Sequence, residues 1–233
     1  MPARSNKPAT PFKKRFRTRP TTFFCTGNTL NCWKRPVIRR ERWRNGGGFA
    51  NYCRIIRSQG KTGEAEEYFA RAIRIRPEFV EAIDESGQAL AKQGKWEQSI
   101  ARYVQALGLQ PNDATIHLHL ADVLAAHGRR AEALANLREA IRLRPGFWEA
   151  RYLLGVELAL QEKIEEARGQ FAEVIRLQPD FAPGHLNLGV ALAKQGRMED
   201  AFVQFRETLR LDPQNKLARQ HIETIQSLKS RTR

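Results

Sequence analysis

The side chains best suited to chemistry in this sequence are its five histidines, its three cysteines and several paired acids. His117 and His119 are two residues apart, roughly 200° around a helix, so they cannot share a metal ion. Cys25, Cys32 and Cys53 are odd in number and form no CxxC pair, which argues against a disulfide framework or a zinc site. We therefore expect no cofactor, no metal and a reducing, cytoplasmic environment.

The paired acids and the glycine run also have structural explanations. The pairs at 66–67 and 165–166 begin predicted helices, where the helix dipole favours acids, so we interpret them as solvated faces. The triple glycine at 46–48 is followed by no Lys-Ser/Thr, which makes it a linker rather than a phosphate loop. No nucleophile has a base at a catalytic spacing, and we expect the protein not to be an enzyme.

Charge divides the chain into two parts. Residues 1–45 hold 13 Lys and Arg against one acid, so they carry +12 of the total +15. Their prolines argue against a long helix, and we predict a disordered basic head. A misplaced start codon or a frame slip is an alternative origin for these residues. The body is nearly neutral, and no stretch of the chain reaches the roughly 18 apolar residues that a membrane span needs.

The body is built from an internal repeat. The six letters ALAKQG occur at 89–94 and again at 191–196, which is 102 residues later. Prolines at 77, 111, 145, 179 and 213 recur every 34 residues, so 102 is three steps. The frame gives five units, at 46–79, 80–113, 114–147, 148–181 and 182–215, followed by a predicted capping helix and basic tail at 216–233.

Each unit has the pattern of two antiparallel helices. A glycine separates the halves in four units, at 60, 94, 128 and 196, and the proline ends the second helix. Small residues stand at the eighth and twentieth places, where they let the two backbones approach closely. Larger residues four places later are expected to pack between neighbouring units. They are Phe69, Tyr103, Leu137, Phe171 and Phe205.

This spacing resembles the tetratricopeptide repeat family over 170 residues. The resemblance implies an all-α fold, a right-handed α-solenoid of antiparallel helix pairs. The chain departs from the family at two points. The fourth place lacks tryptophan and holds Phe49, Ile83, His117, Arg151 and His185, among which we expect the histidines at 117 and 185 to be structural. The fourth unit has Glu162 in place of the turn glycine.

The resemblance also implies a concave groove lined by the first helices. The family's groove places hold charged residues in the first two units, such as Arg54 and Arg57, and apolar ones later. The predicted peptide-binding residues are Leu118, Asp122, Tyr152, Val156, Leu186, Asn187 and Val190. Leu153 and Leu160 occupy groove places too, and a core position is an equally good interpretation for both. The carboxylate clamp of chaperone-binding relatives is absent.

We therefore predict a monomeric, non-enzymatic scaffold whose partner is a protein or peptide ligand bound in the groove. Two alternatives stay open. The array is the detached repeat region of a larger enzyme, such as a glycosyltransferase, or the basic head binds nucleic acid. Phe16, Phe23, Trp33 and Trp43 in that head would stack on bases while the cations hold phosphates. The near-neutral body argues against nucleic acid as a partner.

Overall fold

The structure, a computed structural model, describes residues 62–231. This part of the chain forms ten α-helices and contains no strand. The first is α3 (Thr62–Ile75), the second helix of the first unit. The next four units supply the pairs α4 (Val80–Lys92) and α5 (Trp96–Leu109), α6 (Ala114–Ala126) and α7 (Arg130–Leu143), α8 (Trp148–Leu160) and α9 (Ile164–Leu177), and α10 (Ala182–Lys194) and α11 (Met198–Leu211). The last helix is α12 (Lys216–Arg231).

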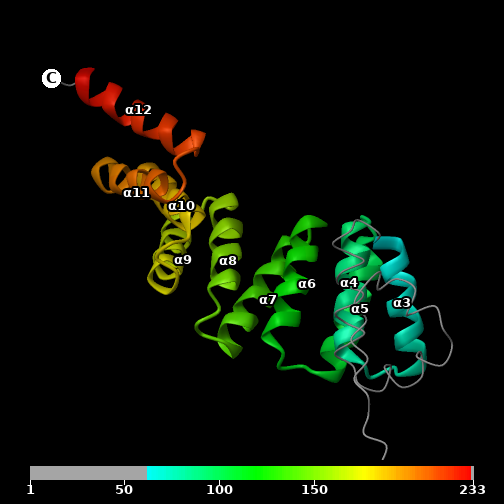
Figure 1. Cartoon of the computed structure of the whole chain (residues 1–233). Coiled ribbons are helices and arrows are strands. Elements are labelled where there is room, and N and C mark those ends of the chain that lie inside the picture. Colours follow the sequence, from blue (N-terminus) through cyan, green and yellow to red (C-terminus); the bar gives the residue numbers. More distant parts are fainter. Residues whose placement is uncertain (1–61, 232–233) are drawn as a thin grey trace, which may run out of the picture. The chain divides into compact units, whose positions relative to one another are not determined.

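The helices stack in the order of the sequence, as Figure 1 shows from α3 to α12. Each helix packs against the next one along the chain, and the first helices α4, α6, α8 and α10 also touch one another in a row. Within residues 62–231 the main contacts therefore join neighbouring units, which is the arrangement of a helical repeat solenoid. The fold is all-α, as the repeat predicts.

Small residues let the two helices of one unit approach closely. A Cβ added to Gly155 would lie 2.6 Å from the ring of Phe171, and one added to Gly189 would lie 2.6 Å from the ring of Phe205. The large residues therefore fill their own unit as well as the space between units. Phe205 also stacks on His221 of α12, with ring centroids 4.7 Å apart. The prediction of packing between units was incomplete on this point.

The turns inside the units use the left-handed backbone conformation. Gly94, Gly128 and Gly196 have φ values of +72°, +83° and +78°, as expected for glycines that end a helix. Glu162, at the same place in the fourth unit, adopts φ +58°. The backbone thus keeps the glycine geometry although a side chain is present, and this turn is strained. Gly60 lies outside the described residues.

The polar residues at the fourth place of the units form hydrogen bonds to the loop that precedes their helix. His117, Arg151 and His185 each hydrogen-bond the carbonyl oxygen of the closing proline six residues earlier, at 2.8–3.1 Å. Each side chain also reaches an amide oxygen on the second helix of its own unit, as His185 does with Gln204 at 2.9 Å. The two histidines are structural, as predicted. In these three units, polar side chains that hydrogen-bond to the preceding loop stand in place of the family's tryptophan.

The last helix, α12, covers the end of the stack with one face. Ala218 and Ile225 are buried, whereas Arg219, Glu223 and Gln226 are exposed. This division follows from the sequence, because the apolar residues of 216–231 share one stripe. A single apolar face lets α12 pack on α11 while its other side meets water.

Candidate functional site

A pocket of about 260 Å³ lies where α8 and α10 meet the start of α9. Its lining is mostly apolar and consists of Val156, Ala159, Leu160, Ile164, Phe171, Asn187, Val190, Ala191 and Lys194. Pockets that enclose drug-sized ligands measure about 300–1,000 Å³. The volume of this pocket suits one or two apolar side chains of a larger ligand.

The side chains of the pocket range from buried to open. Phe171 is only 2% exposed, and Ala191 is buried beside it. Leu160 is 55% exposed although it is a large apolar residue. At the rim, the ammonium group of Lys194 pairs with the Glu162 carboxylate at 3.0 Å. The result is an apolar hollow with a polar edge, which is the composition expected of a ligand site.

The structure places three of the seven predicted groove residues in this lining, namely Val156, Asn187 and Val190. Leu186 is half-buried on α10 outside the lining. Leu118 is half-buried and Asp122 is exposed, both on α6. The predicted Arg54 and Arg57 lie outside the described residues.

Tyr152 also lies outside the pocket lining, although it stands next to it. Its hydroxyl accepts a hydrogen bond of 3.2 Å from the amide of Asn187, and its ring meets Phe181 edge-on with centroids 5.1 Å apart. A second ring, Phe171, lies 6.1 Å away. Tyr152 therefore holds α8 to the following unit and orients Asn187 at the pocket.

Leu153 and Leu160 differ in how exposed they are, although the sequence leaves a core position and a groove position equally open for both. Leu153 is half-buried on α8, whereas Leu160 is exposed and lines the pocket. The sequence does not point to the lining residues Ile164 and Ala191, because both stand outside the usual groove places of the family. Ile164 begins α9, and the hydrophobic pattern of that helix assigns it to packing. In the structure Ile164 is half-buried and lines the pocket.

The groove places of α4 and α6 carry charge instead. His119 lies 2.6 Å from Asp84, measured between Nδ1 and Oδ1. Burial alone would lower the pKa of His119, but the hydrogen bond to Asp84 and the charges of Asp84, Asp122 and Glu85 together raise it above its ordinary value of 6.5. Four acid and imidazole groups therefore gather at this end of the row of first helices.

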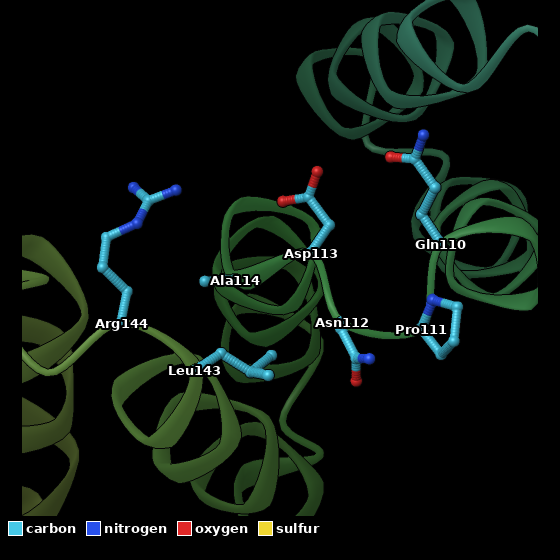
Figure 2. A pocket seen from close by; sticks show the side chains of 7 residues that line it. All are labelled: Gln110, Pro111, Asn112, Asp113, Ala114, Leu143 and Arg144. Atoms are coloured by element: carbon cyan, nitrogen blue, oxygen red, sulfur yellow. The ribbon is translucent and has the colours of Figure 1, made fainter.

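A second hollow, of about 520 Å³, lies among the loops at the start of α6 and the end of α7 (Figure 2). Asp113 caps α6 there, because its carboxylate accepts from the backbone N–H groups of Thr115 and Ile116. The guanidinium of Arg144 lies over the ring of Phe147, 4.4 Å from its centroid. Asp113 and Arg144 are thus engaged in local structure, and this hollow is a weaker candidate than the α8–α10 pocket.

In residues 62–231, no group of three or more His, Cys, Asp and Glu residues is arranged to hold a metal ion. None of the described helices has the length and apolar character needed to cross a membrane.

Comparison with known families gives matches along most of the array. A family model described as "Tetratricopeptide repeat" matches residues 120–180 and 152–216, and a second with the same description matches 55–79. A model described as "TPR repeat" matches 87–128. Among curated proteins, none matches the chain.

Several solved structures share the fold. YrrB, described as "a TPR protein with an unusual peptide-binding site", is 22% identical with a TM-score of 0.61, and the match covers 78% of this chain and 93% of YrrB. MamA from Desulfovibrio magneticus, solved from its residue 41 to the end, is 22% identical with a TM-score of 0.64, and the match covers 73% of this chain and 97% of the solved MamA chain. A TPR protein from Thermus thermophilus is 18% identical with a TM-score of 0.60, covering 77% and 98%. At these identities the similarity concerns the fold alone.

Proposed function

Because the chain belongs to the tetratricopeptide repeat family, we propose that it is a non-enzymatic scaffold that binds an apolar peptide segment or partner helix. The binding site is the α8–α10 pocket. The observation that supports it is the exposed apolar lining, above all Leu160 at 55% exposure beside Val156 and Val190. An amphipathic helix or an extended peptide would cover these side chains with one or two hydrophobic anchors.

The size of the pocket sets the expected strength of binding. Burying one apolar anchor contributes roughly 1.5–3 kcal/mol, and the pocket has room for one or two. Ordering the peptide opposes part of this gain, so further contacts along the row of first helices are needed to reach micromolar affinity, about −8 kcal/mol. The similarity to YrrB supports the choice of a peptide ligand, since that protein is described as having a peptide-binding site.

Peptide-display selection against the full chain tests the proposal. The selected peptides are then measured by fluorescence polarisation on the wild type and on Leu160→Ser. We expect the variant to bind about tenfold more weakly, because the anchor loses apolar surface. The matched control is Val203→Ser on α11, an apolar residue that is 59% exposed and lies outside the pocket. Equal weakening by both variants, or by neither, would contradict the proposal.

Tyr152 needs a different test, because its contacts with Phe181 and Asn187 give it a packing role. Tyr152→Ala should therefore lower both affinity and stability, whereas Tyr152→Phe keeps the ring and removes only the hydroxyl. The Phe variant isolates the hydrogen bond that orients Asn187. Of the two alternatives, the detached enzyme region has no supporting observation within residues 62–231, and the basic head at 1–45 lies outside the described residues.

A further inference from the structure

The residues that line the α8–α10 pocket have counterparts one unit earlier, on α6, α7 and α8. Subtracting 34 from the lining residues gives Asp122 for Val156, Arg130 for Ile164 and Glu157 for Ala191. Arg130 and Glu157 lie in neighbouring units and pair with each other, with Nε and Oε2 3.7 Å apart. Their apolar counterparts, Ile164 and Ala191, both line the α8–α10 pocket. The repeat therefore places a charged region, formed by Asp122, Arg130 and Glu157, one unit before the apolar α8–α10 pocket.

Glu157 is unusual at this position. It is 9% exposed, whereas the same place holds Ala89, Val123 and Ala191 in the other described units. Within residues 62–231 its Oε2 atom accepts no hydrogen bond, and the 3.7 Å distance to Arg130 is too long for one. A buried carboxylate oxygen without a donor is costly, and such an atom calls for a ligand or solvent to supply the donor.

The surrounding charge is negative. Asp122 is exposed on α6, and Asp84 and Glu85 on α4 lie close enough to His119 to raise its pKa together with Asp122. Arg130, which pairs with Glu157, is itself 51% exposed, and the imidazole of His119 is already paired with Asp84. This charged region of the groove therefore favours an added positive charge over an added negative one.

On this basis we propose that the ligand of the groove carries a lysine or arginine beside its hydrophobic anchor, and that this cation binds between Asp122 and Glu157. The inference rests on the proposed function, because the anchor is assigned to the α8–α10 pocket. Neighbouring packed helices lie about 8–10 Å apart, and an extended chain advances about 3.3 Å per residue. The cation therefore belongs about three residues from the anchor, on the side of α6.

The experiment displays a library of random twelve-residue peptides to the full chain and compares the enrichment with that on Leu160→Ser. We expect peptides that depend on Leu160 to carry Lys or Arg about three residues from an apolar residue. Two synthetic peptides are then made from one selected sequence, one with its Lys and one with Glu at that place. On the wild type, the Lys peptide should bind about tenfold more tightly or better.

Two variants test where the cation binds. Asp122→Asn changes an exposed residue and should leave folding intact, and Glu157→Gln keeps the side-chain shape. Each should reduce the preference for Lys over Glu severalfold. Glu199→Gln, an exposed acid on α11, is the control and should leave the preference unchanged.

The outcomes separate the two proposals. Peptides that depend on Leu160 but show no basic preference, or an acidic one, would overturn this inference and leave the proposed function standing. A preference for Lys that survives both Asp122→Asn and Glu157→Gln would also overturn it. An absence of any peptide that depends on Leu160 would overturn the proposed function and this inference together.

Discussion

At the scale of single residues, the fit between glycine and an aromatic ring decides how closely two helices pack. Gly87, Gly155 and Gly189 each face a ring of the second helix, Tyr103, Phe171 and Phe205, at distances that leave no room for a methyl group. The third unit has Ala121 and Leu137 at the same two places, and both are fully buried. A smaller partner there makes room for the methyl group of alanine.

Gly155→Ala is therefore expected to destabilise the protein by about 1–3 kcal/mol, because Phe171 is buried and cannot move aside freely. The change is measured as the free energy of unfolding in urea. Gly169→Ala on α9 is the control. That glycine is helical and has open space around it, so alanine should stabilise the helix by up to about 1 kcal/mol. Equal effects of the two variants would contradict the close-packing argument.

His119 links stability to pH at the same scale. Because its pKa is raised above 6.5 in the folded protein, folding favours the protonated imidazole while Asp84 is ionised. This contribution is fully present just below pH 6.5 and is lost as the pH rises through the raised pKa. The melting temperature of the wild type, relative to His119→Gln, should thus fall between pH 6 and pH 9. A constant difference across this range would refute the linkage.

At the scale of the elements, the turn between α8 and α9 is the strained member of a regular series. Glu162 adopts φ +58°, where the other described turns use glycine. Its side chain is 74% exposed and pairs with Lys194. The helix pair still forms because the packing of α8 on α9 determines where the chain reverses, and the turn residue adapts at a cost.

A comparison of Glu162→Gly with Glu162→Ala measures that cost. Both variants lose the exposed ion pair with Lys194, but only glycine relieves the left-handed strain. Glycine also makes the unfolded chain more flexible, which offsets part of the relief. We expect the Gly variant to be more stable than the Ala variant by up to about 1 kcal/mol in urea unfolding. An Ala variant as stable as the Gly variant would show that this turn carries no strain.

At the scale of the whole molecule, each described unit is stabilised mainly by contacts with the adjacent units. In residues 62–231 each helix packs on the next, and first helices touch first helices of adjacent units. A destabilising substitution at one end should therefore lower the stability of nearby helices only, as in other arrays of stacked repeats. The α8–α10 pocket lies within reach of the end formed by α11 and α12.

Phe205→Ala tests this locality by hydrogen exchange. Phe205 is fully buried, contacts the Gly189 backbone and stacks on His221, so its truncation should cost about 3–5 kcal/mol. Amides of α10, α11 and α12 should exchange much faster, whereas those of α4 and α5 should change little. Uniformly faster exchange across residues 62–231 would show that the array unfolds as one cooperative unit.

The sequence by itself determined the period, the positions of the helices and the family. A proline every 34 residues and small residues at fixed places act locally or within one helix pair, so their effect can be deduced without coordinates. The structural role of the histidines at 117 and 185 followed from the same register. Their proline-carbonyl partners did not, since a hydrogen bond depends on where a loop lies in space.

Only the tertiary structure decided which groove places form a pocket. Leu153 and Leu160 have the same residue type and similar places, yet one is half-buried and the other is 55% exposed. The pocket needs side chains from α8, α9 and α10 at once, and the angle between neighbouring units determines whether they converge. The pairing of Arg130 with Glu157 is of the same kind, because two residues 27 positions apart meet only when one unit stacks on the next.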